Sequence, residues 1–258
     1  MSEIPNKIAV IEKAVRILEF MVDYPYGISL SELESGVQLN KSTIYRILFT
    51  LKDNGYIIQN PDDAKYRIGP RFLLYQSVFD ETDLARAASP ELRRLAASTG
   101  DICHLVIRDH CEGVYIDKVD PPESSGIAVR SRIGARVPLH CTSVGKVLLA
   151  DLSEGEVDDI IAAAGLPART PQTITDPLRL KRELDLVRRQ GYAVDDLENE
   201  ENVRCVAAPI RDHVGKVVAA VSSTGTILSV TSQTMPSIIC EVRHCGEQIS
   251  RSLGYRIK

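Results

Sequence analysis

The apolar positions at the start of the chain recur at intervals of three or four residues, which is the spacing of an amphipathic helix. Residues 7–23 carry such a stripe, and we expect it to face the core: Ile8, Ile11, Val15, Leu18 and Val22. A Tyr-Pro-Tyr-Gly sequence then interrupts the pattern. Residues 29–36 predict a short second helix, in which Ser29 and Glu32 form a capping box and Gly36 ends the helix.

A third helix is predicted within NKSTIYRILFTLKDNGYI, residues 40–57, from an Asn40 N-cap to a stop at Gly55. Its apolar positions form a core-facing stripe: Ile44, Ile47, Leu48 and Leu51. Two short strand patterns, YIIQN and KYRIG, follow around a turn at residues 61–63. Three helices with a short turn before the third, followed by a hairpin, indicate a winged helix-turn-helix.

The helical pattern of residues 71–88 predicts a linker helix that also forms the dimer contact. The chain then divides into a winged helix-turn-helix domain at 1–70, this linker, and a C-terminal domain at 89–258. The sequence Ser-Pro-Glu at 89–91 predicts that a new helix begins there, with proline at its first position.

Strand patterns dominate from residue 101 onward, at DICHLVIRD, EGVYIDKVD, IAVRSR, YAVDD, VRCVAAPIRD and KVVAAVSST. Helices are predicted at TSVGKVLLAD with Thr142 as cap, at EGEVDDIIAAAG, at PLRLKRELDLVRRQG between an Asp176 cap and a Gly191 stop, and at about 232–253. Groups of strands and helices in this order predict an α+β domain with a mainly antiparallel sheet.

The composition is that of a globular protein, since 44% of the 258 residues are hydrophobic and 26% are charged. The apolar runs are too short to cross a bilayer and the N-terminus has no signal-peptide pattern, so we expect a cytoplasmic protein without membrane contact. The net charge of −4 argues against nucleic-acid binding, but no acidic residue lies from Ser35 to Lys52. The third predicted helix is therefore locally cationic.

The N-terminal end of this helix carries the side chains that a recognition helix presents to the major groove. The predicted DNA contacts are Lys41, Ser42, Thr43, Tyr45 and Arg46 on the helix, with Lys65 and Arg67 on the wing. The helix dipole favours a phosphate near Lys41, and Arg46 is the candidate for a bidentate contact to guanine. The alternative is a packing module with a solvated polar face, which the acid-free stretch and the basic wing disfavour.

Four collinear stretches resemble the IclR family of bacterial transcriptional regulators: NKSTIYRILFTLKDNGYI with KYRIG, SRIGARVPLHCTSVGKVLLA, GYAVDDLENEENVRCVAAPI and ISRSLGY. The resemblance covers roughly residues 7–255, and VYIDKVD and SRIGARVPL are most similar to the regulators of ketodeoxygluconate and pectin catabolism. It implies a GAF-like effector-binding domain and favours a repressor that forms homodimers or homotetramers. A dimer would bind a near-palindromic operator in double-stranded DNA. The residues themselves leave open the sign of regulation, the operator and the effector.

The resemblance also implies a small organic acid as effector, either a sugar acid, a 2-oxo acid or a hydroxylated aromatic acid. The family's effector contacts correspond to Ser143, Val144, Gly145, Asp195, Cys205, Ser222 and Thr224. Backbone amides and hydroxyls suit an anion, whereas a carboxylate such as Asp195 suits a ligand hydroxyl better than a ligand carboxylate. Arg132 adds a positive charge if it faces inward. Where the family has glycine this chain has Asn202, a residue that tolerates positive φ.

The same polar residues are also compatible with structural roles and with a different function. Ser222 and Thr224 also suit strand-end hydrogen bonds, and Cys205 suits a buried apolar position. Four of the five histidines are adjacent to a cysteine, which suggests a metal- or redox-responsive regulator as the alternative function. Neighbours on a strand point to opposite faces, so we predict no metal and no cofactor. The chain lacks a nucleophile elbow, a P-loop and an HExxH helix, and we predict that it is not an enzyme.

Overall fold

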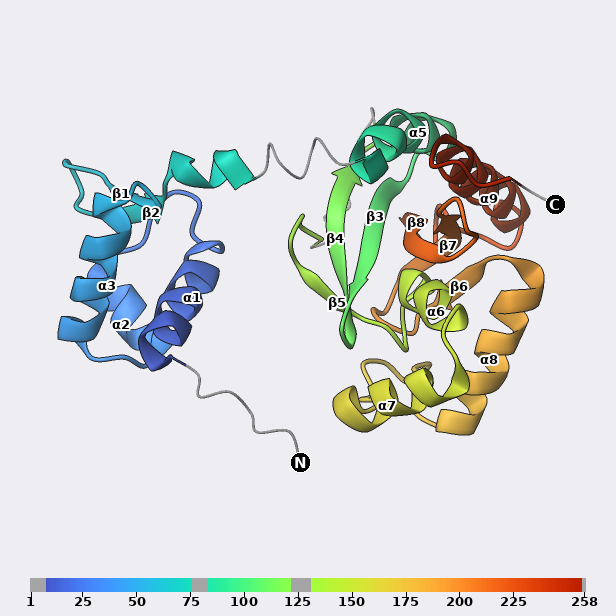
Figure 1. The fold of residues 1–258 in the computed structure, drawn as a ribbon, viewed down its shortest axis with the longest axis horizontal. Helices are drawn as coiled ribbons and strands as arrows, with labels where there is room; N and C mark the ends of the chain where they lie inside the picture. Colours follow the sequence, from blue (N-terminus) through green and yellow to red (C-terminus); the bar gives the residue numbers. More distant parts are fainter. Residues whose placement is uncertain (1–7, 76–82, 122–130, 257–258) are drawn as a thin grey trace. The chain divides into compact units, whose positions relative to one another are not determined.

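The structure, a computed structural model, describes residues 8–75, 83–121 and 131–256 (Figure 1). The chain divides into two compact units, Met1–Glu81 and Thr82–Lys258. This division lies inside the segment predicted as the linker helix. The described part of that segment before the division holds a single 3-10 turn, Pro70–Phe72, followed by a helical start at 73–75. Residues 76–82 lie outside the described residues, and the dimer role of 71–88 stays a prediction.

The N-terminal unit is a winged helix-turn-helix, as predicted. It consists of α1 (Ala9–Met21), α2 (Leu30–Val37), α3 (Lys41–Asp53) and an antiparallel wing of β1 (Ile57–Gln59) and β2 (Tyr66–Ile68). The predicted capping box of Ser29 and Glu32 and the Asn40 cap are both present. One apolar core joins the three helices to the wing: Ile17, Met21, Ile28, Leu33, Val37, Ile44, Ile47, Leu48, Ile57 and Tyr66.

Helix α1 buries a different face from the one predicted. Most of the predicted stripe is exposed, namely Ile8, Ile11, Val15 and Val22, and Leu18 is half-buried. Ile17 and Met21 are buried instead, with Ala14 packed beside them. The helix carries two neighbouring apolar stripes with the same spacing, so periodicity alone could not decide between them.

Gly36 does not end α2, as the sequence had predicted. It lies inside the helix, where a Cβ atom would meet the Phe20 ring at 2.0 Å, so its lack of a side chain lets α1 and α2 approach. The helix ends one residue later, and Gln38 takes the left-handed conformation with φ 53°. The glycine therefore serves helix packing rather than helix termination.

The C-terminal unit is an α+β domain around an antiparallel sheet, as predicted. The six strands have the spatial order β5-β4-β3-β8-β7-β6. Their bounds are Ile102–Asp109 (β3), Glu112–Val119 (β4), Arg136–Pro138 (β5), Ala193–Asp196 (β6), Val203–Arg211 (β7) and Val217–Thr226 (β8). The predicted strand IAVRSR lies largely in residues 122–130, outside the described residues.

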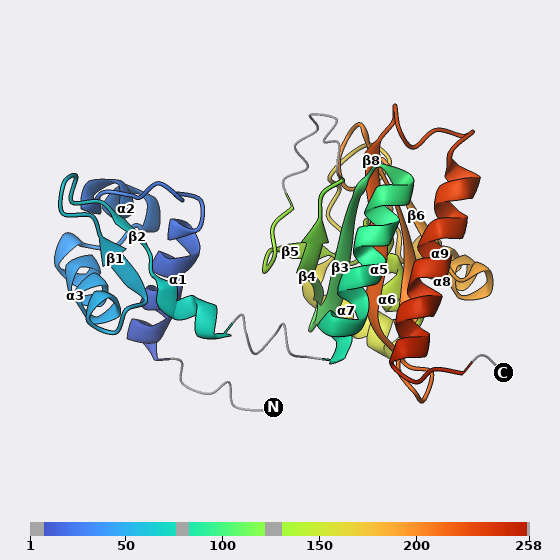
Figure 2. The ribbon, with the colours of Figure 1, turned by 90° about the horizontal axis from the view of Figure 1, so that it is seen from above.

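Helices cover both faces of this sheet. On one face α5 (Asp83–Thr99) and α9 (Met235–Ser252) lie side by side (Figure 2). The other face is covered by α6 (Ser143–Ala150), with α7 (Glu154–Ala164) and α8 (Pro177–Gln190) beyond it. The predicted caps Thr142 and Asp176 accept hydrogen bonds from backbone amides, and Gly191 ends α8 at φ 75°.

The new helix predicted at residues 89–91 does not exist as a separate element. Helix α5 runs without a break from Asp83 to Thr99, with Pro90 in its interior. Ala88, Leu92 and Leu95 lie in the core between the sheet and α9. Burial of this continuous stripe outweighs the loss of one helical hydrogen bond at the proline.

Helix α6 is the central element of the second face, since all eight of its residues are buried. Its close packing depends on Gly145, because a Cβ atom there would lie 2.2 Å from the Leu139 carbonyl oxygen.

None of the helices in the described residues is long and apolar enough to cross a membrane.

Candidate DNA-binding surface and effector site

The N-terminal turn of α3 presents a polar, cationic surface. Asn40 accepts a hydrogen bond from the Thr43 amide at 2.9 Å, and Ser42 donates its hydroxyl to the same oxygen at 3.1 Å. This cap fixes the start of the helix while the buried apolar stripe fixes its rotation. As a result Lys41, Ser42, Tyr45 and Arg46 are exposed and Thr43 is half-buried.

Two large aromatic side chains extend this surface along α3. Tyr45 is 55% exposed and Phe49 is 62% exposed. A shallow hollow of about 510 Å³ lies over them, lined by Val10, Thr43, Tyr45, Arg46, Phe49 and Thr50. The sequence interpretation omitted Phe49 and Thr50 from the DNA contacts. The available signal was a large aromatic residue predicted on the exposed face of a cationic helix.

The two wing cations are less exposed than those of α3. Both Lys65 and Arg67 are half-buried, because they pack over Gly27. A Cβ atom at that glycine would meet the Lys65 Cβ at 3.0 Å and the Arg67 Cγ at 3.2 Å. The Arg67 Nε is buried and has no hydrogen-bond partner in the described part of the chain. Part of the arginine is therefore committed to packing, and the helix offers the freer cations.

In the C-terminal unit the strand register brings together predicted effector contacts that are distant in sequence. Asp195 on β6 pairs with Cys205 on β7, and Cys205 pairs with Thr224 on β8. Ser222 lies two residues from Thr224 and therefore on the same face. That face is the one covered by α6, since Ala193, Ala207 and Ala220 at the same alternation pack in its core.

Asp195 is held in place by the turn that follows its own strand. Its Oδ1 accepts hydrogen bonds from the Glu198 amide at 2.7 Å and the Asn199 amide at 3.4 Å. Burial raises the pKa of Asp195 to about 7, and the nearby Glu198 carboxylate acts in the same direction. The group therefore changes charge near neutral pH, and when protonated it donates a hydrogen bond without repelling an anion.

The start of α6 supplies polar groups on the same face. Thr142 caps the helix by accepting from the Gly145 amide at 3.1 Å and donates its own hydroxyl to the Pro138 carbonyl at 2.6 Å. Among the described residues, no hydrogen bond uses the amides of Ser143 and Val144 or the hydroxyl of Ser222. These groups are available to an anionic ligand.

A buried polar cluster around His104, which the sequence interpretation missed, completes this face. His104 on β3 contacts the Ser131 hydroxyl through Nε2 at 2.7 Å and the Thr224 hydroxyl through Nδ1 at 3.3 Å. Its ring lies 4.8 Å from that of Tyr115 on β4. Burial lowers the pKa of His104 to about 3, so the ring is neutral. Arg132, by contrast, is exposed, and its neighbour Ser131 makes the inward contact.

Lys146 on α6 is a second buried polar residue that the sequence interpretation missed. Its side chain is 1% exposed, and its Nζ lies 2.6 Å from Glu198 Oε1 and 3.2 Å from Glu183 Oε1. The lysine thus ties α6 to the turn that holds Asp195 and to α8. Both hidden clusters are built from contacts between residues far apart in sequence, which local periodicity does not reveal.

The backbone at Asn202 and the surroundings of the cysteines relate to the remaining sequence predictions. Asn202 has φ +70°, so it adopts the left-handed conformation that we expected at the family's glycine position. No group of three or more His, Cys, Asp or Glu residues in the described ranges is arranged to hold a metal ion. Burial raises the pKa of Cys141 and of Cys245 to about 12, which keeps these thiols protonated and poorly reactive.

The comparisons with known protein families match both units. The family described as IclR helix-turn-helix domain matches residues 10–61, and the family described as Bacterial transcriptional regulator IclR C-terminal matches residues 76–251. The HTH-type transcriptional regulator XynR of Escherichia coli K12 is 36% identical over 246 residues, which cover 95% of this chain and 97% of that protein. KdgR of the same strain is 34% identical over 252 residues, covering 97% of this chain and 95% of its own.

Solved structures support the same grouping. The IclR structure from Thermotoga maritima covers 96% of this chain and 100% of its own, with a TM-score of 0.79 and 36% identity. The C-terminal domain of E. coli KdgR covers 67% of this chain and 100% of its own, with a TM-score of 0.61 and 35% identity. The similarity therefore extends over both compact units.

Proposed function

Because this chain belongs to the IclR family of bacterial transcriptional regulators, and is a DNA-binding regulator rather than an enzyme, we propose that a small hydroxylated organic acid controls its binding to an operator. The observation that carries this proposal is the row of Asp195, Cys205 and Thr224 across three neighbouring strands, facing the buried helix α6. A row of polar side chains on an otherwise apolar face suits a ligand with several hydrogen-bonding groups.

The DNA contact is proposed to begin with α3. Lys41 and Ser42 at the helix start meet phosphates, while Arg46 and Tyr45 reach base edges one turn further on. We also propose that Thr43, Lys65 and Arg67 contact the sugar-phosphate backbone of the DNA. One winged helix makes few contacts, so two copies of the chain are proposed to bind a near-palindromic site.

The effector is proposed to span two chemically different ends of the C-terminal site. Its carboxylate meets the free amides of Ser143 and Val144 near Gly145, at the positive end of the α6 dipole. Its hydroxyl meets Asp195, with Ser222, Thr224 and the Cys205 thiol along the strands. The partial protonation of Asp195 near neutral pH reduces the repulsion that a fully charged carboxylate would exert on an acid.

A thermal-shift screen of the full chain tests this proposal. The panel contains sugar acids, 2-oxo acids, hydroxybenzoates and Zn²⁺, each measured with the wild type and with Ser222→Ala. One acid at about 100 times its Kd should add about 2.7 kcal/mol to the free energy of unfolding and raise the Tm by several degrees, an effect reduced in the variant. A rise with Zn²⁺ alone would instead support the metal-responsive alternative.

A further inference from the structure

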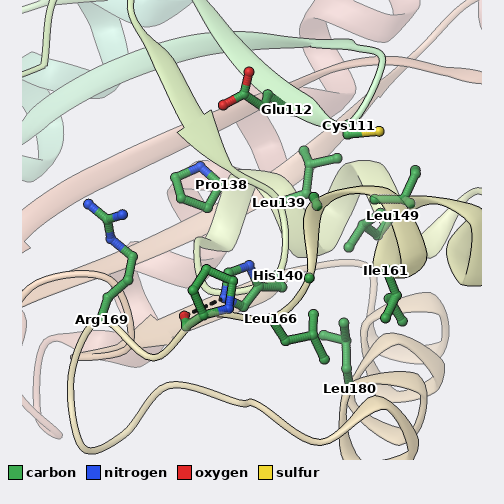
Figure 3. Close-up of a pocket in the computed structure, with 14 residues that line it drawn as sticks. Cys111, Glu112, Pro138, Leu139, His140, Leu149, Ile161, Leu166, Arg169 and Leu180 are labelled. Atoms are coloured by element: carbon green, nitrogen blue, oxygen red, sulfur yellow. Dashed lines mark hydrogen bonds between the residues drawn. The ribbon is translucent and has the colours of Figure 1, made fainter.

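A separate cavity of about 230 Å³ lies on the α6 side of the sheet and contains none of the predicted effector contacts. Its inner wall is apolar, formed by Leu139, Leu149, Ile161, Leu166 and Leu180. Figure 3 shows these side chains gathered on one side of the lining and Arg169 on the other, with its guanidinium directed away from them. The cavity therefore combines an apolar interior with one cationic side chain.

Two charged side chains line this cavity, Glu112 and Arg169. The Glu112 carboxylate lies 3.3 Å from Arg136, an arginine that also pairs with Asp109 at 2.6 Å. Arg169 is exposed, and no ion pair among the described residues involves it. The His140 ring donates its Nε2–H to the Pro167 carbonyl at 3.1 Å, because a carbonyl oxygen can only accept. The unpaired positive charge at the cavity is that of Arg169.

We propose that this cavity is a second ligand site, which binds a small monocarboxylate with a compact apolar body. The Arg169 guanidinium matches the planar geometry of a carboxylate, while the leucine and isoleucine side chains exclude water from the rest of the ligand. Pockets for drug-sized molecules occupy roughly 300–1,000 Å³, so the smaller volume here selects a ligand such as a single-ring or short-chain acid.

The loop that carries Arg169 is also hydrogen-bonded to the neighbourhood of Asp195. The Thr170 hydroxyl donates to the Leu197 carbonyl at 2.6 Å, and the Thr173 hydroxyl donates to the Glu198 carbonyl at 2.6 Å. A ligand beside Arg169 would thus contact a loop that is hydrogen-bonded to the turn whose amides hold the Asp195 carboxylate. These hydrogen bonds connect the second site physically to the proposed effector site. The proposal of a second site does not depend on the function of the effector site.

Benzoate is the probe for this proposal, with benzyl alcohol as an uncharged molecule of the same shape. Binding to the full chain is measured by isothermal titration calorimetry and by the methyl NMR signals of Ile161 and Leu180. Benzoate should bind saturably and shift both signals, whereas benzyl alcohol should bind at least ten times more weakly.

Three variants locate the binding. Arg169→Gln should weaken benzoate at least ten-fold and Ala164→Phe, at an exposed lining position, should abolish binding by filling the cavity. Arg182→Gln, an exposed arginine on α8 outside the cavity, should leave the affinity unchanged. Absence of saturable binding by the wild type, or unchanged binding by Arg169→Gln, would overturn the proposal. Benzoate binding that is lost in Ser222→Ala but kept in Ala164→Phe would assign benzoate to the effector site and also overturn it.

Discussion

Arg46 is the residue from which we expect base discrimination by α3. It is exposed one turn inside the helix, and a bidentate arginine contact to guanine typically contributes about 1–3 kcal/mol. Arg46→Ala should lose about that much at one base pair and relax the preference there. The measurement is fluorescence anisotropy with a set of single-substitution duplexes. Lys52→Ala is the control, since that amine is bound to Gln59 at 3.0 Å; an unchanged base preference in Arg46→Ala would refute the assignment.

Asp195 makes the stability of the C-terminal unit depend on pH. Its pKa is about 7 in the folded chain and about 3.9 in an unfolded one. At pH values between these two pKa values, the folded chain holds one more proton than the unfolded chain. The free energy of unfolding therefore falls as pH rises, by at most about 1.4 kcal/mol per pH unit. Asp195→Asn should lack this contribution. Urea denaturation of both proteins from pH 4 to pH 7 measures the difference, and parallel curves would contradict it.

Individual residues were predictable where their role is local. The caps at Ser29, Asn40 and Thr142 were expected from short sequence patterns, and the structure confirms them. The left-handed conformation of Asn202 was expected from the family resemblance, because the family has glycine there, and it is also present. His104 was missed because its partner hydroxyls lie 27 and 120 residues away. Only the strand register brings such groups together.

Gly145 tests how tightly α6 is packed, and Gly155 in α7 serves as the comparison. Gly145→Ala would force a Cβ atom to within 2.2 Å of the Leu139 carbonyl, which we expect to destabilise the protein by about 1–3 kcal/mol or more. Gly155 in α7 has no atom within 4 Å of its would-be Cβ. Gly155→Ala should therefore stabilise by about 0.5–1 kcal/mol, through helix propensity alone. Chemical denaturation compares them, and effects of the same sign would contradict this account.

The ion pair of Lys146 fixes α6 relative to the 197–199 turn. Lys146→Met should cost about 3–5 kcal/mol, because Glu198 would remain buried without a positive partner. Glu198→Gln in the same chain should restore much of that loss, since the uncompensated charge disappears. Equilibrium unfolding of the two variants provides the test, and a double variant as unstable as the single one would show that packing, not charge, is responsible.

Whole elements were predictable where one pattern dominated. Helix α3 has a single apolar stripe, and its buried face was correctly predicted. Helix α1 has two such stripes, so the wrong one was chosen, and α5 continues through Pro90 because its tertiary contacts outweigh a local signal. Tertiary burial decided both cases, and a single sequence does not record it.

The whole molecule joins a DNA-reading unit to a unit with a polar row under a buried helix. The proposed regulation requires that the effector bind the operator-competent arrangement of two copies and an operator-incompetent arrangement with different affinities. Coupling of this kind typically amounts to about 1–3 kcal/mol, which corresponds to a change in affinity of about 5–150-fold. Under the proposed function, operator binding must change the affinity for the acid by the same factor by which the acid changes the affinity for the operator.

The most direct measurement is the anisotropy of a labelled operator duplex, selected from a random pool, titrated with the full chain with and without the acid found in the thermal screen. We predict that the acid changes the operator Kd at least about five-fold. Ser222→Ala should keep the acid-free Kd and lose most of the response. An operator Kd that stays the same at saturating acid would contradict the proposal that a bound organic acid controls operator binding.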